Sequence, residues 1–337
     1  LEWFMTHVTS LPVSENFAWV TGWTDDLSGE RLRQALADAG VKAIIDFPNA
    51  PPEAKPPMIM RNPWWAQPFE LFARMLGTPA NDEADPSRLL AVLAPLLFGY
   101  MFGDVGHGLV LVAVGLLYQR RWPVLRILIA NGLAATVFGF VFGSVFGRED
   151  IIPALWLHPM EDPLPVLLVP LAGGVLVLLL GLVLNAVELY WRGEFMHWIR
   201  VEAAVLVLYL SLIAAFYAPQ LLLLSAAAVL WYFAGSLLQS RARWWSTLVG
   251  AAGGLLESVF QLLVNTVSFV RVGAFALAHG GLSLAFITLA AATDSAIAGM
   301  LILLLGNLIV IMLEGLVVTI QTTRLILFEF FIRFLRG

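Results

Sequence analysis

One long apolar stretch, Gly254–Ala291, constrains the fold of this chain more than any other part of its sequence. It is apolar enough to lie in lipid, yet an arginine, Arg271, stands near its middle. Four polar residues precede this arginine at helical spacings and fall with it on one face of an α-helix: Glu257, Gln261, Asn265 and Ser268. Because a charge at membrane depth costs at least a few kcal/mol, the stripe indicates a functional site. The alternative is that Arg271 pairs with a carboxylate and only holds helices together.

The composition is that of a membrane protein. The chain has 337 residues, of which 60% are hydrophobic and 13% charged, and its mean hydropathy is +0.84. We therefore expect an all-α polytopic membrane protein with a small α+β part at its N-terminus. A net charge of −5 without a basic tract argues against nucleic acid as a partner.

Several kinds of chemistry are excluded by residues that the sequence lacks. There is no cysteine, which excludes disulfides, zinc–thiolate sites and thiol nucleophiles. No Gly-rich phosphate loop of the G-x-x-x-x-G-K-[ST] type occurs, so we expect no nucleotide hydrolysis by that route. The sequence predicts a non-catalytic protein with no cofactor and no metal site.

Residues 1–86 form the polar part of the chain. We predict a strand, a helix and a second strand, which together are too small to bury a core: Phe17–Thr24, Leu27–Ala39 and Val41–Phe47. Pro48–Pro57 is a proline-rich linker. In the following segment, Trp64 and Trp65 are expected either at a membrane interface or against the polar part.

Residues 87–337 form the membrane domain, with about eight predicted spans. Their approximate ranges are 89–102, 105–119, 123–146, 165–191, 200–217, 220–238, 254–291 and 296–335. Glycines at Gly103–Gly108 divide the first apolar run, so we predict a tight hairpin of two short spans. The last two runs approach forty residues each, or roughly 57 Å of helix, and must therefore tilt steeply or project from the bilayer.

Loop charges predict the orientation. With a cytoplasmic N-terminus, arginines fall on the inside by the positive-inside rule: Arg120, Arg121, Arg126, Arg192, Arg200, Arg241, Arg243, Arg333 and Arg336. The outside segments are acidic, with Arg148 the one basic exception: Glu149, Asp150, Glu161, Asp162 and Asp294. We expect a multi-pass cell-membrane protein, of prokaryotic origin, with both termini in the cytoplasm.

A second polar stripe follows the last apolar run. Its members lie near one helical face at spacings of seven, seven and three: Asn307, Glu314, Gln321 and Arg324. Glu314 and Arg324 are too far apart to pair within one helix, so each needs a partner elsewhere. A guanidinium stays protonated and would force a passing carboxylate to ionise, while buried glutamates or histidines can relay protons. His279 and His107 are candidates for such a relay, although a lone buried histidine is more often structural.

Three motifs together resemble the membrane half of subunit a (subunit I in prokaryotes) of V-type and A-type rotary ATPases, the 116 kDa subunit family. They are APLLFGYMFGDVGHG at Ala94–Gly108, NTVSFVRVGAFALAHGGLS at Asn265–Ser283 and LEGLVVTIQTTRLILFEFF at Leu313–Phe331. The resemblance runs from about residue 14 to the C-terminus. It implies that most of the family's cytoplasmic arm lies upstream of Leu1, so that the chain is a fragment or a processed product.

The resemblance also assigns residues. The family's essential arginine falls on Arg271 and its second arginine on Arg324, and its proton-translocating partners fall on Glu257, Glu314 and His279. Gln321 stands where eukaryotic members have a histidine, which puts a proton-relay role there in doubt. Further residues are expected to line the channel: Gln261, Asn265, Ser268, Asn307, Gln321, Asp104 and His107.

The function that this implies is a stator subunit that forms two proton half-channels against a ring of small proteolipid subunits. Expected partners are this ring, the peripheral-stalk and central-stalk subunits, and membrane lipid. Protons are favoured over sodium, because no other group of residues resembles a cation cage. Glu257, Asn265 and Ser268 would line one path, and Glu314 with Gln321 or His279 the other.

Two other classes of function compete with this one. A self-contained secondary transporter predicts inverted repeats with breaks at corresponding positions in two halves. The sequence has a glycine-rich break in its first half only, at Gly103–Gly108, and no internal repeat. A purely structural anchor, in which the polar stripes only hold helices together, is the third possibility.

Overall fold

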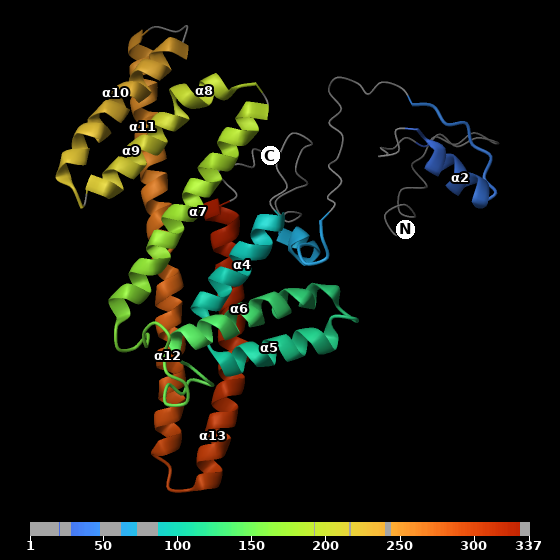
Figure 1. The fold of residues 1–337 in the computed structure, drawn as a ribbon, viewed down its shortest axis with the longest axis vertical. Coiled ribbons are helices and arrows are strands. Elements are labelled where there is room, and N and C mark those ends of the chain that lie inside the picture. The colour runs from blue at the N-terminus through green and yellow to red at the C-terminus, as the bar shows by residue number, and fades with distance from the viewer. Residues whose placement is uncertain are drawn as a thin grey trace. The chain divides into compact units, whose positions relative to one another are not determined.

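The computed structural model of this chain describes residue 20 and residues 28–47, 62–72, 87–191, 193–215, 217–239 and 244–330. The chain divides into two compact units, Leu1–Ile59 and Met60–Gly337. Figure 1 shows the described helices of both units.

The first unit contains one described helix, α2 (Glu30–Asp38), within the range that the sequence predicts. It ends at Gly40, whose φ of 70° lets Val41 N donate to Leu36 O at 2.9 Å and close the helix. The predicted strand Val41–Phe47 is wrong, because these residues pair with no other strand in the described part of the chain. The predicted strand Phe17–Thr24, apart from Val20, and the linker Pro48–Pro57 lie outside the described residues.

A short segment before the first span belongs to the second unit. The 3-10 helix η2 (Gln67–Phe69) buries Phe69, and Phe72 follows it into the core of the unit. The side chains of Trp64 and Trp65 remain exposed, which favours an interfacial position for them. This segment is therefore anchored by its phenylalanines and not by its tryptophans.

The second unit is built from helices that follow the predicted spans closely. The first two are short, α4 (Ser87–Met101) and α5 (Val105–Tyr118). In chain order the middle helices are η3 (Pro123–Leu125), α6 (Arg126–Phe142), α7 (Pro163–Trp191), α8 (Phe195–Arg200), α9 (Glu202–Ala215), η4 (Pro219–Leu221) and α10 (Leu222–Gln239). Six helical segments of the described chain are long and apolar enough to cross a membrane, and α4 and α5 are shorter apolar helices.

The last two spans are long and interrupted. The first comprises α11 (Trp244–Ser268) and α12 (Val270–Ala291), so it begins about ten residues before the predicted start at 254. The glycines at 250, 253 and 254 do not end the helix, since glycine is tolerated in membrane helices. The second comprises α13 (Ala296–Ile309), the π-helix η5 (Val310–Glu314), α14 (Gly315–Arg324) and the π-helix η6 (Leu325–Phe330).

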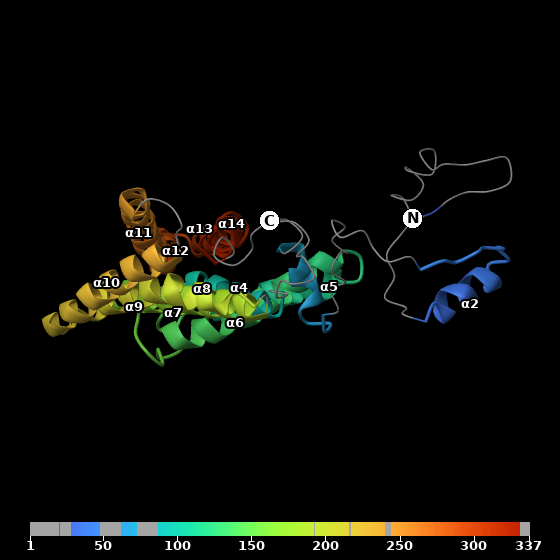
Figure 2. The ribbon, with the colours of Figure 1, turned by 90° about the horizontal axis from the view of Figure 1, so that it is seen from above.

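The spans of the second unit run in two main directions. Helices α11–α12 and α13–α14 form two long columns side by side, whereas α5 and α6 lie side by side across that direction (Figure 1). In the view from above, the long columns are seen nearly end-on and α5 and α6 lengthwise (Figure 2). A membrane normal cannot follow both directions, so one set of spans is steeply inclined relative to the other.

The predicted tight hairpin of α4 and α5 is an elbow instead. Helix α5 packs most extensively along α6, and the chain turns sharply at Phe102–Asp104 between α4 and α5 (Figure 1). Glycines on facing positions allow this close approach: a Cβ at Gly108 would lie 2.6 Å from Thr136 N, and one at Gly132 2.7 Å from Gly108 O. The glycines that suggested a turn therefore also serve as a helix–helix contact.

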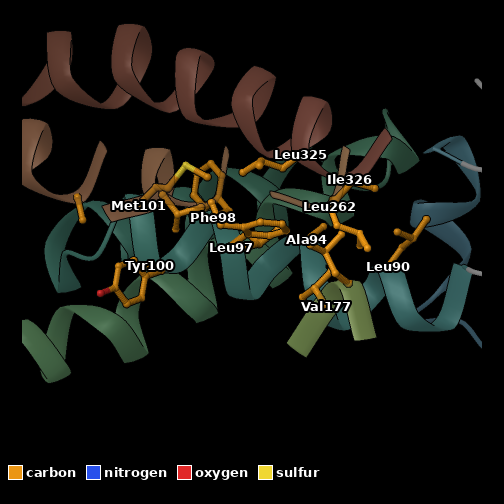
Figure 3. Close-up of a cluster of buried hydrophobic side chains, with 14 of the residues drawn as sticks. Leu90, Ala94, Leu97, Phe98, Tyr100, Met101, Val177, Leu262, Leu325 and Ile326 are labelled. Carbon is orange, nitrogen blue, oxygen red and sulfur yellow. The ribbon is translucent and has the colours of Figure 1, made fainter. Parts of the chain in front are cut away.

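Helix α4 lies at the centre of the unit. Its side chains Leu90, Ala94, Leu97, Phe98 and Met101 face the crossing helices (Figure 3). Opposite them lie Leu262 of α11, Val177 of α7, and Leu325 and Ile326 of η6. The buried helix thus fixes the two long columns against the rest of the unit, which positions the polar residues described next.

Candidate ion-translocation site

The polar stripe that leads to Arg271 is divided between two helices. Helix α11 ends at Ser268 and α12 begins at Val270, with Phe269 buried between them. Thr266, one turn earlier, donates to Leu262 O at 2.7 Å and contacts the hydroxyl of Tyr209 at 2.6 Å. Arg271 therefore lies in the first turn of α12, at a break held by buried contacts on both sides.

Arg271 reaches across to the last span. Its Nη1 donates to Oε1 of Gln321, on α14, at 3.3 Å. Gln321 is neutral, so this hydrogen bond positions the guanidinium without cancelling its charge. Arg324, one turn further along, has an exposed side chain, and no ion pair joins it to the described residues. The two arginines of the stripes are thus brought to the same part of the molecule.

Glu329 is a member of this group that sequence reasoning missed. It is buried with an exposed fraction of 4%, it accepts a hydrogen bond from Ser268, and the charges of Arg271 and Arg324 act on it. A period of 3.6 residues puts Glu329 off the stripe of Arg324, five residues earlier. The π-helix η6, with its i to i+5 hydrogen bonds, changes that register. The sequence signal that could have identified Glu329 is its position as a carboxylate within the apolar end of the motif Leu313–Phe331.

We call Ser268, Arg271, Gln321, Arg324 and Glu329 the arginine cluster. It draws on α11, α12, α14 and η6, so it exists only when the two long spans lie side by side. It combines two permanent cations, one buried carboxylate and neutral donors. Such a set can hold and release an additional carboxylate.

A second polar group lies along the same columns, with its histidines and carboxylates buried and Asn307 half-buried. Nδ1 of His279 lies 2.8 Å from Oε2 of Glu314, and Nε2 of His107 lies 2.7 Å from Oδ1 of Asn307. The rings of His107 and His279 are 5.4 Å apart, and Phe102 contacts both. Together with Asp104, these residues form what we call the histidine cluster. The partner that Glu314 was expected to need elsewhere thus comes from α12, and Asn307 is contacted from α5.

Asp104 is the N-cap of α5 and secures the loop after α6. Its carboxylate accepts hydrogen bonds from His107 N at 2.9 Å and Ser144 Oγ at 2.7 Å. It also accepts from Phe146 N at 2.9 Å and Gly147 N at 2.7 Å. Four donors fill the acceptor positions of a fully buried carboxylate. This makes Asp104 first of all an anchor of the 144–147 loop, in addition to the channel-lining role that was predicted.

The outer half of the first stripe is not brought into either cluster. Glu257 and Gln261 have exposed side chains on α11, and Asn265 is half-buried with its Nδ2 unpaired among the described residues. Glu257 and Gln261 face outward from the unit. They are placed to contact lipid, water or another subunit.

Outside the spans, one surface ion pair lies in the loop between α6 and α7. Arg148 Nη2 and Asp150 Oδ2 are 2.7 Å apart, with both side chains exposed. The hydrogen bond from Arg148 lowers the pKa of Asp150, and the same bond raises the pKa of Arg148. Arg148, the basic exception in the predicted outside segments, is thus locally paired with an acidic residue.

The helices and the arginines and carboxylates between them define a class, that of multi-pass membrane proteins, and comparisons with known proteins show which of these the chain is similar to. The model of the V-type ATPase 116kDa subunit family matches residues 5–123. A-type ATP synthase subunit I of Thermococcus kodakarensis is 28% identical over 288 residues, which cover 79% of this chain and 43% of that protein. For subunit I of Pyrococcus horikoshii the identity is 25% over 312 residues, with 83% and 46% covered.

One relative matches a shorter part of the chain at a higher sequence identity. Subunit I of Archaeoglobus fulgidus is 35% identical over 101 residues, which cover 28% of this chain and 15% of that protein. The chain spans about half the length of the curated relatives that it matches over most of its own length. The chain is thus similar over most of its length to A-type ATP synthase subunit I of several archaea, and over residues 5–123 to the V-type ATPase 116kDa subunit family.

Proposed function

We propose that this chain is the membrane part of a rotary-ATPase stator subunit, which carries protons past a ring of proteolipid subunits. The observation that carries the proposal is the hydrogen bond of Arg271 to Gln321 between the two long spans. It keeps a permanent cation at membrane depth with its charge uncancelled by an ion pair. A relative named A-type ATP synthase subunit I covers most of the chain and supports the same role.

In this mechanism, the arginine cluster acts on rotor carboxylates. A protonated carboxyl group on the ring approaches Arg271 and Arg324 and ionises, because the ion pair stabilises its charged form. The planar guanidinium suits a carboxylate in a bidentate arrangement, and Gln321 orients it for that contact. The same positive charge repels protons and blocks a direct leak between the two sides.

Two groups of residues provide access for protons. The exposed Glu257 and Gln261 and the half-buried Asn265 on α11 lead toward Ser268, and so form one path. The histidine cluster, in which His279 bonds Glu314, forms the other. The two paths are separated at the arginine cluster. A proton therefore crosses from one path to the other while it is bound to a carboxyl group of the rotating ring.

The proposal includes partners and location. The ring of proteolipids faces the two long columns, and the peripheral-stalk and central-stalk subunits couple the chain to a catalytic head that carries out the ATP chemistry. This chain is the ion-translocating and not the catalytic subunit. It lies in a prokaryotic cell membrane with both termini in the cytoplasm, as the loop charges predict.

Cysteine cross-linking tests the ring contact, because the natural chain contains no cysteine. Ile320 of α14 has an exposed fraction of 55% and lies one turn from Arg324. Ile320→Cys should form a disulfide with a cysteine placed beside the rotor carboxylate. Leu230 of α10, with an exposed fraction of 71%, provides the matched control Leu230→Cys, which should form none. Equal cross-linking at both positions, or cross-linking only at Leu230, would contradict the proposal.

A further inference from the structure

Three ligand-type residues of the histidine cluster converge although they lie on different helices. Asp104 caps α5, His107 lies in the first turn of α5, and His279 lies on α12. One oxygen or nitrogen of each lies within 4.8 Å of the others, and all three side chains are buried. Such a set differs from the exposed acidic groups that are common on protein surfaces.

The hydrogen bonds fix the tautomer of His107. Nδ2 of Asn307 donates to Leu303 O at 2.8 Å, which orients the amide so that Oδ1 faces His107. Because a carbonyl oxygen only accepts, Nε2 of His107 must carry the proton in their 2.7 Å contact. Nδ1 then presents its lone pair, and it has no hydrogen-bond partner although the residue is fully buried.

The same argument applies to His279. Its Nδ1 lies 2.8 Å from the carboxylate of Glu314, so the proton sits on Nδ1 and the lone pair on Nε2. Nε2 is buried and also without a hydrogen-bond partner. Two buried imidazoles therefore each have one nitrogen held by an acceptor and the other left free. Unsatisfied buried polar atoms are uncommon and require an explanation.

We propose that Asp104, His107 and His279 bind a divalent transition-metal ion of the zinc type, with Asn307 and Glu314 as the groups that orient the two imidazoles. Oδ1 of Asp104 accepts from His107 N and Phe146 N, so it exchanges the hydrogen bond from His107 N for the ion. Histidines that bind metals almost always donate their second ring N–H to a carboxylate or carbonyl oxygen. Both histidines here do so. Two imidazoles and one carboxylate suit zinc or cobalt and are poor ligands for magnesium or calcium.

The spacing of the donors fits a small four-coordinate ion. Nδ1 of His107 and Oδ1 of Asp104 are 3.5 Å apart. Ligand atoms about 2.1 Å from a tetrahedral zinc are separated by roughly 3.4 Å. Binding requires the remaining pairs, which lie up to 4.8 Å apart, to close by up to about 1.4 Å. Three protein ligands leave the fourth position to water.

The bound ion would lock the two long columns to the short helix α5. Through Glu314 and Asn307, the lock would extend to the last span. A consequence rests on the proposed function: an ion that binds His279 prevents it from accepting protons, so zinc should inhibit proton transport. The site itself does not depend on that function, and the two can be tested separately.

Cobalt titration of the purified complex in detergent, carrying an affinity tag without histidine, tests the site. We expect visible bands typical of four-coordinate Co²⁺, at one ion per copy of this chain, which Zn²⁺ removes. His107→Ala and His279→Ala should each weaken binding at least tenfold. His158→Ala is the matched control, because His158 lies in the loop after α6 outside the cluster and should change nothing.

Other outcomes separate the site from the proposed function. Absence of the bands in the wild-type complex, or bands that both histidine variants retain, would overturn the metal site. If the alanine variants fail to assemble, X-ray absorption at the zinc edge of the wild-type complex decides, with two imidazoles and one carboxylate expected and any other ligand set contradicting the proposal. Binding without inhibition of proton transport would leave the site standing and count against the transport role of His279.

Discussion

The arginine cluster and the histidine cluster lie along the same pair of long spans, yet they are built on opposite principles. In the histidine cluster, buried groups are matched to acceptors within the chain, as His279 is to Glu314. In the arginine cluster, the hydrogen-bond partner of Arg271 is neutral, Arg324 is exposed, and one carboxylate, Glu329, faces two guanidinium groups. A charge at membrane depth that is not neutralised internally requires a partner from outside. The difference indicates that the arginine cluster serves a moving partner, and that the histidine cluster fixes the fold or holds a small ion.

The largest effect on stability is expected at Asp104, the anchor residue of the histidine cluster. Asp104→Ala would leave four donors without their acceptor, and should lower the free energy of unfolding by roughly 3–5 kcal/mol. Thermal unfolding of the detergent-solubilised complex measures this loss. Ser144→Ala removes only one of the donors and should cost about 1 kcal/mol. Equal, small effects of both changes would show that Asp104 is not an anchor.

A change in the arginine cluster should affect proton transport and leave the free energy of unfolding nearly unchanged. Gln321→Glu places a carboxylate at the position 3.3 Å from Arg271, and neutralises the guanidinium that a rotor carboxylate must reach. Displacing such a pair costs more than about 1.4 kcal/mol, so proton transport in proteoliposomes should fall at least roughly tenfold. The same chemical change at the exposed Gln220 of η4 is the control and should have no effect. Normal transport by Gln321→Glu would remove Arg271 from the proposed path.

The smallest effect is expected at the surface pair, which belongs to neither cluster. The pKa of Asp150 is lowered by its hydrogen bond from Arg148, so the pair stabilises the fold above the ordinary carboxyl pKa near 4. That contribution is lost as the pH falls through the lowered pKa. Because both side chains are exposed, Asp150→Asn should shift the melting temperature only slightly at pH 5–8, and not at all in strong acid. A large shift at neutral pH would contradict this expectation.

Much of the fold is predictable from the sequence because apolar runs and their interruptions are local signals. Proline and glycine mark the ends of spans, and α4 and α5 begin and end within two residues of their predicted limits. The elbow between them was not predictable, since it depends on Gly108 meeting Gly132 of a different helix. The predicted strand at Val41–Phe47 failed because a strand requires a partner, which local patterning cannot supply.

Most residues of the candidate site could be selected from the sequence, but the contacts between them could not. Helical periodicity selected Arg271, Glu314 and Gln321, but the contact of Arg271 with Gln321 joins residues on separate spans. Periodicity also assumed one continuous helix, whereas a break at Phe269 and two π-helices change the register. Glu329 was missed for that reason, and the pairing of the two histidines depends on α5 reaching the long columns.

The central claim is that Arg271 is the cation on which transport depends. Its most direct test is proton uptake into vesicles that hold the assembled complex with Arg271→Gln, with ATP hydrolysis and subunit assembly measured in parallel. We predict that assembly survives and that proton uptake disappears, because Gln carries no charge to stabilise the ionised rotor carboxylate and the exposed Arg324 does not replace the guanidinium that Gln321 holds. Proton uptake close to that of the natural protein would contradict the account and make Arg271 a structural contact between two helices.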